Sequence, residues 1–381
     1  MSRPLLFTSF FPLGYHNVEA ERKAEALQRF GYDVLYVTAP LIRNPRPTEL
    51  RRIARHALRK LRRRPSRGPS GSRLRSTSLL FLPPRQLEPV VRLNAAWAER
   101  QLVHALPSLR EGAAAWVRWP TPEIVAALPR LRPAVVVYEC VDSYWETPGV
   151  RGRWREVYDS AERRLCELAD VVVATNETIA ARLEGYGTPV ELLPHGVDLF
   201  PPRPAPANER PVLGFVGSLD YRIDTAVVRA LAQAHPEWRL RFLGPVQQGF
   251  DPAAYADLPN VTVEPPVPHA RLAEVLAGFD VGLMPYFDHP VYRHMSPVKN
   301  LELLAAGRPA VARPSPALEP FRELLYLAET PAGFVAAVER ALAEDGPELV
   351  ARRRSAAAEH GWERRYARMR ELLEGPRARA R

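Results

Sequence analysis

Short apolar segments alternate with longer amphipathic ones along most of this chain of 381 residues, and that alternation limits the folds it can adopt. Segments of mainly apolar residues predict strands at residues 5–10, 33–39, 76–82, 114–119, 134–138, 170–175 and 190–194, with helical patterns such as 18–30 between them. Apolar strands separated by helices predict a parallel sheet covered by helices on both faces.

The pattern starts again after a proline-rich stretch. Residues 200–211 hold five prolines in twelve positions, which is typical of a stiff linker. We therefore predict an α/β protein with two Rossmann-like, doubly wound parallel-sheet domains facing a cleft, residues 1–200 and 212–360, joined by a linker at 201–211. Ligands of such sheets bind beyond the carboxyl ends of the strands. Residues 361–381 are predicted to form a C-terminal helix that packs back across the hinge.

One segment makes the chain basic. Residues 43–75 contain thirteen Lys or Arg and a single acid, a net charge of +12, so the rest of the chain carries −2 against a total of +10. A helix is predicted from Thr48, with apolar residues on one face and arginines on the other. This pattern fits an anionic membrane surface as partner through residues 46–75, and it fits equally well a solvated helix that covers one face of the domain. Since no aromatic residues interleave with the arginines, no nucleic-acid partner is expected.

Cysteine use and hydropathy indicate the compartment. Cys140 and Cys166 are too few for a disulfide framework or a metal site, which fits a reducing cytosol. The N-terminal stretch is too quickly interrupted for a signal peptide, and no apolar run approaches the roughly 20 residues that a spanning helix needs. We expect a cytoplasmic protein, peripheral on the inner membrane face if the basic segment binds lipid.

The stretch from Val291 to Ala312 carries an unusual lysine. Lys299 is one of three lysines in the chain, against fifty arginines. Ser296 is predicted to cap a helix that ends at Gly307, which places Lys299 in its first turn. Free amides at such an end attract phosphate, and Glu302, one turn further, could accept the two hydroxyls of a ribose. The alternative is an ordinary surface ion pair between Lys299 and Glu302.

A glycine turn follows the first strand of the second domain. In the stretch LGFVGSLDYRID, Gly217 would let the backbone approach a phosphate, and Arg222 would add charge. Such a turn is weak evidence by itself. In the first domain, the stretch YECVDSYWETPG follows a strand, so Glu139, Asp142, Tyr144 and Trp145 could bind acceptor hydroxyls and a sugar face. A loop cap for the acids and simple packing for Trp145 are the alternatives.

Taken in order, these stretches resemble glycosyltransferases of the GT-B fold, and are similar to glycosyltransferase family 4 and its teichuronic-acid-biosynthesis-type branch. The resemblance rests on four ordered elements: Tyr138 to Asp142, Gly196-Val197-Asp198, Phe215 to Asp224, and Ser296-Pro297 with Lys299, Glu302, Gly307 and Pro309. It covers most of the chain, and most strongly residues 135–312.

The resemblance implies a hexosyltransferase that takes its sugar from a nucleotide-diphosphate donor, here with a weak preference for UDP. It implies Gly217, Arg222, Ser296, Lys299 and Glu302 as donor-binding residues. It also implies transfer with retention and no cofactor or metal ion, and no DxD cluster is present in the sequence. The other partner would be a glycan or lipid-linked acceptor.

Three positions depart from the family pattern. His294 stands where many members have a second Glu, Glu139 where the branch has Asp, and the first glycine-rich turn is reduced to Gly14. We take Asp142 and His294 as catalytic candidates. The acceptor-side candidates are Gly14, His16, Arg118, Glu139, Tyr144 and Trp145.

Two other functions remain open on the sequence. One is a nucleotide-sugar epimerase or hydrolase on the same fold, and the other is a non-catalytic nucleotide-sugar-binding subunit, which the change at His294 keeps in view. A hydroxyl acceptor is required only by the transferase.

Overall fold

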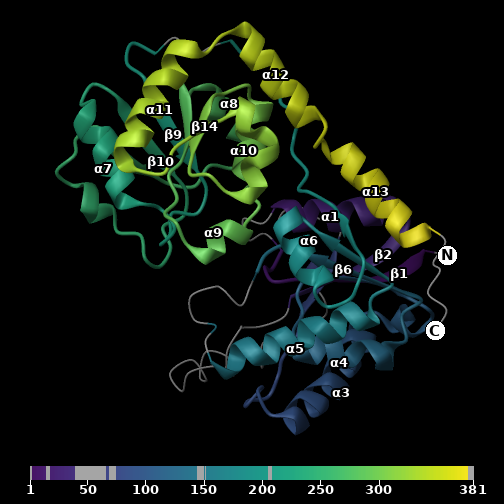
Figure 1. The fold of residues 1–381 in the computed structure, drawn as a ribbon. Helices are drawn as coiled ribbons and strands as arrows, with labels where there is room; N and C mark the ends of the chain where they lie inside the picture. The colour runs from purple at the N-terminus through teal and green to yellow at the C-terminus, as the bar shows by residue number, and fades with distance from the viewer. Residues whose placement is uncertain are drawn as a thin grey trace. The chain divides into compact units, whose positions relative to one another are not determined.

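The computed structural model describes residues 2–13, 18–38, 66–67, 74–143, 150, 152–204 and 208–375. The chain divides into two compact units (Figure 1): unit 1 is Met1–Leu193 with Tyr366–Arg381, and unit 2 is Pro194–Arg365. Polypeptide therefore passes between the units after Leu193 and again within helix α13 (Trp362–Glu374).

Unit 1 contains an eight-stranded sheet in the order β3-β4-β2-β1-β5-β6-β7-β8, in which every neighbouring pair is parallel except β3 with β4. Its interior strands β1, β5 and β6 are apolar and almost wholly buried, as expected for a sheet covered on both faces. The strands are β1 (Arg3–Ser9), β2 (Tyr32–Thr38), β3 (Ser66–Arg67), β4 (Arg75–Ser78), β5 (Ala114–Val117), β6 (Val135–Cys140), β7 (Val171–Ala174) and β8 (Val190–Leu192).

Helices join these strands, and several have clear sequence signals at their starts. Thr121 and Asn176 cap two of them by accepting hydrogen bonds from backbone amides of the first turn, at 3.3 and 2.9 Å. The helices of unit 1 are α1 (Val18–Arg29), α3 (Glu88–Ala105), the 3-10 helix η1 (Pro107–Arg110), α4 (Pro122–Leu131), α5 (Arg153–Leu168) and α6 (Glu177–Glu184).

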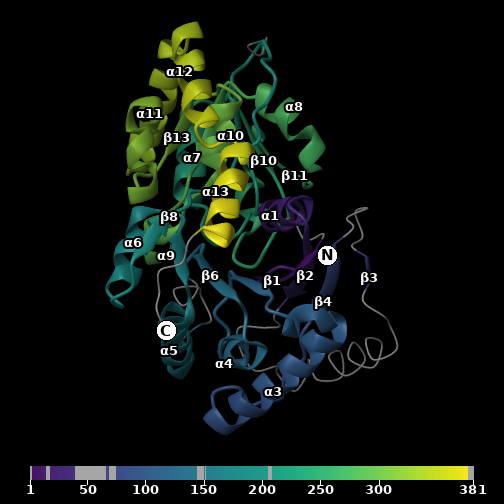
Figure 2. The same ribbon diagram turned by 90° about the vertical axis from the view of Figure 1, so that its right-hand side faces the viewer.

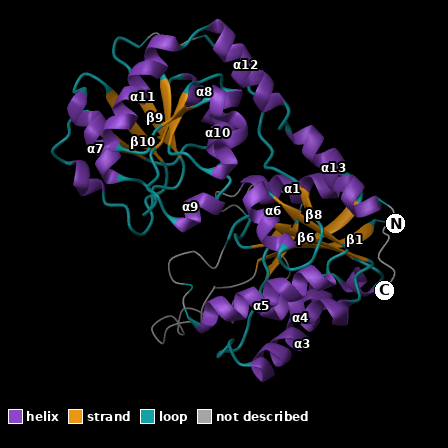
Figure 3. Cartoon of the chain, viewed as in Figure 1, coloured by secondary structure: helices purple, strands orange, loops and turns teal. Residues whose placement is uncertain are grey.

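Unit 2 contains a six-stranded parallel sheet in the order β11-β10-β9-β12-β13-β14. Strands are orange in Figure 3, where β9 and β10 of this sheet are labelled. The strands are β9 (Val212–Val216), β10 (Arg239–Leu243), β11 (Val261–Glu264), β12 (Val281–Met284), β13 (Ala310–Ala312) and β14 (Tyr326–Leu327). The helices are α7 (Thr225–Ala234), η3 (Pro252–Tyr255), η4 (His269–Arg271), α8 (Leu272–Ala277), α9 (Pro290–His294), α10 (Val298–Ala305), η5 (Pro316–Leu324), α11 (Pro331–Glu344) and α12 (Pro347–Ala358). Two parallel sheets with helices confirm the predicted fold class.

Small residues in the unit 2 sheet let helices approach closely. A Cβ at Gly282 of β12 would collide with the side chain of Leu303, so this glycine allows α10 to pack directly on the strand. The chain leaves β9 toward β10 on one side and has β12 on the other, so the order reverses at β9. Ligands of open α/β sheets bind at such a reversal.

The second half of α13 belongs to unit 1, seen at the end of the yellow ribbon in Figure 2. Its residues Tyr366, Met369, Leu372 and Leu373 are buried there. The guanidinium of Arg29 lies 5.2 Å from the ring centroid of Tyr366, and Arg368 pairs with Glu191. Within unit 2, the two crossing segments are joined, since the amide of Val197 donates to the carbonyl of His360 at 2.9 Å.

The proline-rich stretch is bound to unit 2. The guanidinium of Arg354 donates to the carbonyl of Phe200 at 2.6 Å, and that of Arg308 to the carbonyl of Pro204 at 3.1 Å. The division between units lies at Leu193–Pro194, seven residues before the position expected from composition. The prolines mark where the composition of the chain changes, whereas the boundary between the units is set by which residues pack together.

The strand expected over 76–82 is shorter than predicted. β4 ends at Ser78, because the backbone of Leu80 and Leu82 is hydrogen-bonded by side chains of α3 and not by a neighbouring strand. The predicted basic helix and most of the basic segment lie outside the described residues. Across the residues that are described, no helix is long and apolar enough to cross a membrane.

Candidate functional site

Lys299 and Gly217 lie against each other in unit 2. Lys299 is in the first turn of α10, and its Nζ is 5.2 Å from the ring centroid of Phe215 in β9. Gly217 follows that strand with a φ of 143°, and a Cβ placed there would lie 2.5 Å from Nζ.

A second glycine lies beside Gly217. The amide of Gly217 donates to the carbonyl of Leu243 at 2.9 Å, and a Cβ at Gly244 would collide with the carbonyl of Gly217. Gly244 has a φ of 158°. The residues that directly follow β9 and β10 are therefore both glycines, and their lack of side chains lets the two turns and the Lys299 side chain approach one another closely.

Arg222 is held by an acid two residues before it. Its Nε and Nη2 donate to the two carboxylate oxygens of Asp220 at 2.8 and 2.6 Å, and Nη1 lies 3.0 Å from Sδ of Met295. Burial acts to lower the pKa of Arg222, but the hydrogen bond with Asp220 and the charge interactions with Tyr286, Asp220 and Tyr221 together outweigh it, and the pKa is raised. Because Met295 immediately precedes Ser296, Arg222 lies beside the start of α10.

The two cations rest on a pair of packed aromatic rings. Lys299 lies over Phe215 and the Arg222 guanidinium is 5.8 Å from the ring centroid of Tyr286. The two rings meet edge to face with centroids 6.0 Å apart. A cation over an aromatic face is attracted by the ring electrons. The Lys299 and Arg222 side chains are therefore both held at the same edge of the sheet.

The start of α10 differs from the prediction by one residue. Ser296 was expected as the cap, but the helix begins at Val298 with Pro297 in the capping position, so the Ser296 prediction as a cap is wrong. Pro297 has no side-chain acceptor, which leaves the first-turn amides of α10 uncapped by it. Glu302 lies one turn further along, and His294 ends α9; both are half-buried.

Two acceptor-side candidates lie instead in a buried ion cluster of unit 1. Nζ of Lys23 pairs with Glu139 and, at 2.6 Å, with Glu19. Arg118 reaches the same two acids at 2.9 Å each, and the indole nitrogen of Trp116 donates to Glu139 at 2.6 Å. The cluster joins helix α1 to the ends of β5 and β6.

Glu139 and Arg118 thus have structural partners in unit 1, and their acceptor-side role stays a prediction. The Glu139 side chain is fully buried and that of Arg118 is 4% exposed, so neither is offered to solvent. Burial acts to raise the pKa of Glu139, but the charges of Arg118 and Lys23 outweigh it and the pKa is lowered. Pairing with a lysine 116 residues away is a tertiary contact that no local pattern could indicate.

Of the remaining candidates in unit 1, only Asp142 lies among the described residues. Asp142 is half-buried just beyond the carboxyl end of β6, and its backbone carbonyl lies 3.6 Å from Sγ of Cys140. Gly14, His16, Tyr144 and Trp145 lie outside the described residues. Cys140 and Cys166 are both buried, and neither is in a disulfide bond.

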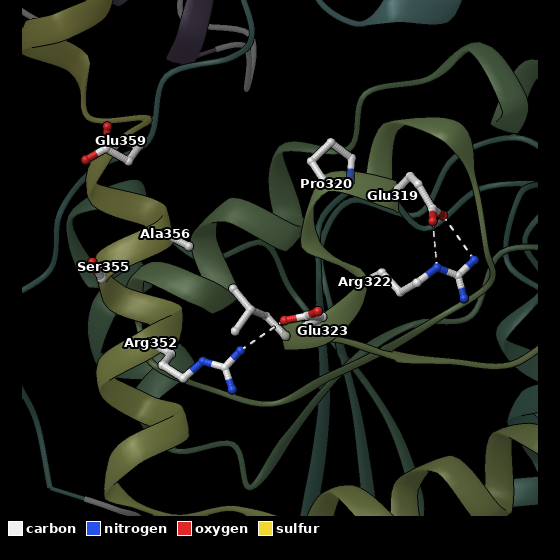
Figure 4. A pocket seen from close by; sticks show the side chains of 9 residues that line it. Glu319, Pro320, Arg322, Glu323, Arg352, Ser355, Ala356 and Glu359 are labelled. Carbon is white, nitrogen blue, oxygen red and sulfur yellow. Dashed lines mark hydrogen bonds and ion pairs between the residues drawn. The ribbon is translucent and has the colours of Figure 1, made fainter.

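A separate open cavity of about 580 Å³ lies in unit 2 between η5 and α12 (Figure 4). Its wall carries two ion pairs, Arg322 with Glu319 and Arg352 with Glu323. None of the predicted site residues lines it. Among the described residues, no group of three or more His, Cys, Asp or Glu side chains is arranged to hold a metal ion.

Sequence reasoning missed the supports of the site. Asp220, which fixes Arg222, is visible in the sequence as D-x-R, a spacing at which an acid can reach an arginine across a turn. Met295 and the Phe215–Tyr286 pair gave no such signal, because their roles depend on the packing of β9 against β12.

A family model described as glycosyl transferase-like matches residues 222–373. Among curated proteins, TuaH of Bacillus subtilis (strain 168), provisionally named a teichuronic acid biosynthesis glycosyltransferase, is 28% identical over 254 residues, or 60% of this chain. The chain spans 64% of the length of that relative, somewhat less than two thirds.

Solved structures resemble the chain over nearly its whole length. Sucrose-phosphate synthase from Thermosynechococcus elongatus has a TM-score of 0.68 at 18% identity and covers 97% of this chain and 98% of its own. Anabaena HepE, in complex with UDP-glucose, has a TM-score of 0.65 at 14% identity and covers 98% of this chain and 100% of its own. The chain therefore has the fold of the GT-B glycosyltransferases, as its sequence resemblance predicted, and residues 222–373 form its glycosyl transferase-like part.

Proposed function

We propose that this protein is a glycosyltransferase that moves a hexose from a nucleotide-diphosphate sugar, with UDP favoured, to a hydroxyl of a glycan or lipid-linked acceptor. One observation carries the proposal: Lys299, Gly217 and the uncapped start of α10 meet at the edge of the unit 2 sheet, with Arg222 beside them. The UDP-glucose complex of HepE, which has the same fold, supports the choice of donor.

The proposed roles follow from charge. As the bond between the anomeric carbon and the diphosphate oxygen breaks, its electron pair leaves with the diphosphate, whose charge grows. Lys299, Arg222 and the amides of α10 would stabilise that charge, which is why we propose transfer without a metal ion. Glu302 would accept the ribose hydroxyls of the donor.

The acceptor oxygen forms the new bond to the anomeric carbon, and its proton passes to the leaving diphosphate, whose oxygen has just gained the electron pair of the broken bond. We propose that Asp142 orients the acceptor hydroxyl and that His294 contacts the donor sugar, with overall retention at the anomeric carbon. The basic segment at 46–75 would hold the enzyme on anionic lipid at the inner membrane face, near a lipid-linked acceptor.

A thermal-shift panel with UDP-, GDP-, ADP- and dTDP-glucose tests the donor, because a ligand that binds only the folded state raises the melting temperature. We expect UDP-glucose to give the largest shift. Labelled UDP-glucose with and without a lipid-linked glycan acceptor then tests the reaction. Sugar transfer only with acceptor supports the transferase; turnover without acceptor indicates an epimerase or hydrolase, and binding without turnover a non-catalytic subunit.

A further inference from the structure

Arg313 lies at the carboxyl edge of the unit 2 sheet, where it directly follows β13. Its side chain is only 13% exposed. Nε donates to the backbone carbonyl of Tyr286 at 2.7 Å, and Nη2 donates to the carboxylate of Asp224 at 3.4 Å. One side chain therefore bonds two segments of unit 2 that are far apart in the sequence.

Those two segments also pair with each other. Arg222 and the two residues after it form a short antiparallel bridge with residues 285–287, joined by backbone hydrogen bonds of 2.7 and 3.0 Å. Arg313 bonds one residue on each side of this bridge, Asp224 and Tyr286. The backbone that carries Arg222 is therefore held in place from the end of β13.

Tyr286 links Arg313 to the Arg222 side chain. Its ring centroid lies 5.8 Å from the Arg222 guanidinium, while its carbonyl accepts the hydrogen bond from Arg313. A displacement of the Tyr286 backbone would therefore move the ring on which the Arg222 charge rests. A change at Arg313 should thus be felt at Arg222, although the two arginines do not bond each other.

The backbone of Arg313 supplies a second link. Its carbonyl accepts a hydrogen bond of 2.6 Å from the hydroxyl of Tyr292. Tyr292 is buried in the short helix α9, which ends at His294. Met295 follows that helix, and its Sδ lies 3.0 Å from Nη1 of Arg222. Both links from Arg313 therefore end at the same guanidinium.

Arginine suits this position for a geometric reason. Its planar guanidinium can donate to a carbonyl and to a carboxylate at the same time in fixed directions, which the single ammonium of a lysine cannot do. The carboxylate of Asp224 is itself fixed, since it caps α7 by accepting from the amide of Ala226 at 2.9 Å. Arg313 therefore ties the Tyr286 segment to the start of α7.

We propose that Arg313 is a positioning residue for Arg222. It holds the Tyr286 ring and Met295 in the places where they keep the Arg222 guanidinium beside the start of α10. The inference rests on the proposed function, which assigns Arg222 to the diphosphate of the donor. It adds that donor affinity depends on a residue that acts through Arg222 and does not itself contact the diphosphate.

Titration calorimetry with UDP-glucose tests this in a double-mutant cycle. Arg313→Met keeps the stem of the side chain and removes both bonds of the guanidinium. We expect it to weaken binding about tenfold in the wild-type background and at most about twofold in the Arg222→Met background, because its effect requires Arg222. A merely structural effect on unit 2 would weaken binding equally in both backgrounds. That result, or wild-type binding by Arg313→Met, would overturn the positioning role.

The matched control is Arg229→Met. Arg229 is also in unit 2, and it also donates to a carbonyl, that of Ala254 at 2.9 Å, and to a carboxylate, that of Asp257 at 2.8 and 2.6 Å. This variant should bind UDP-glucose as wild type does. If Arg313→Met does not fold, Arg313→Lys takes its place in the cycle with the same expectation, because it keeps the charge and loses the fork.

Amide hydrogen exchange without ligand separates this inference from the proposed function. The amides of Asp224 and Phe287 bond across the bridge, so Arg313→Met should speed their exchange and Arg229→Met should not. If wild type binds no UDP-glucose, the proposed donor falls, while the exchange rates still decide whether Arg313 holds the bridge. Unchanged exchange in Arg313→Met would overturn the inference whatever the donor.

Discussion

Gly217 leaves the space that Lys299 fills: a Cβ at position 217 would lie 2.5 Å from the lysine Nζ and would also collide with Cε. Gly217→Ala should therefore displace the ammonium from its place over Phe215. We expect UDP-glucose binding, measured by titration calorimetry, to weaken about tenfold or more, since a charge-assisted contact is lost. The left-handed φ should add a loss of unfolding free energy of about 1–2 kcal/mol.

Gly187→Ala is the matched control. Gly187 also has a positive φ, 79°, but a Cβ there would meet nothing within 4 Å, and it belongs to unit 1. It should show the backbone strain without the loss of donor binding. If both variants bind UDP-glucose as wild type does, the contact between Gly217 and Lys299 has no role in the donor site.

Lys299→Met should separate charge from packing. Methionine keeps an apolar stem beside Phe215, so the melting temperature of the free protein should change little. The shift caused by UDP-glucose should largely disappear, because a buried charged contact to phosphate contributes about 1.5–3 kcal/mol. Differential scanning fluorimetry measures both quantities, and a full ligand-induced shift in Lys299→Met would exclude this lysine from the diphosphate site.

Glu139 should prove structural. Glu139→Leu leaves Lys23 and Arg118 buried with only Glu19 between them, which should cost about 3 kcal/mol in unit 1. The double variant Lys23→Met/Glu139→Leu should be less destabilised than Glu139→Leu, because it also removes a charge. Because a chain of two units need not unfold in one step, hydrogen exchange of β6 amides is the appropriate measurement.

The same cluster gives unit 1 an acid-sensitive element. The pKa of Glu139 is lowered in the folded state, where the charges of Arg118 and Lys23 outweigh the effect of burial. Its contribution to stability is therefore present above its unfolded pKa and is lost as the pH falls through the folded pKa. Protection of β6 should decline on acidification more steeply in wild type than in the double variant; identical profiles would contradict the pairing.

His235 should stabilise unit 2 only when protonated. Its ring stacks on Trp238 with centroids 3.7 Å apart, and its two nitrogens lie 2.8 Å from Glu237 and 2.9 Å from Glu339. Burial acts to lower the pKa of His235, but the hydrogen bonds with Glu339 and Glu237 raise it above its ordinary value. A raised folded pKa means that the stabilisation is complete below the unfolded pKa and is lost as the pH rises through the folded one.

His235→Phe keeps the stacking and removes the proton. This variant should melt at a lower temperature than wild type at about pH 6, and at nearly the same temperature as wild type at about pH 9. Glu339→Gln should show a smaller change with the same pH dependence. A melting difference that does not vary with pH would show that the ring acts through packing alone.

Much of the fold could be predicted from the sequence, because parallel strands that are buried on both faces consist of continuous apolar residues, and such runs are easily recognised. The sequence also singled out the residues of the candidate site, since Lys299 is one of three lysines against fifty arginines and Gly217 and Arg222 follow a predicted strand. The features that the sequence did not predict depend on contacts with residues far away in the chain. Glu139 lies in a loop-like stretch of sequence, yet its environment is decided by Lys23, and residues 79–82 were apolar enough for a strand but are held by α3.

Unit 1 is completed by residues that follow unit 2 in the sequence. Tyr366, Met369 and Leu372 of α13 are buried in it, more than 170 residues after Leu193. During synthesis, all of unit 2 must leave the ribosome before these side chains can close the first core. The earlier part of unit 1 therefore lacks part of its core until then, and removing the residues from Tyr366 onward would take buried side chains from the half that is translated first.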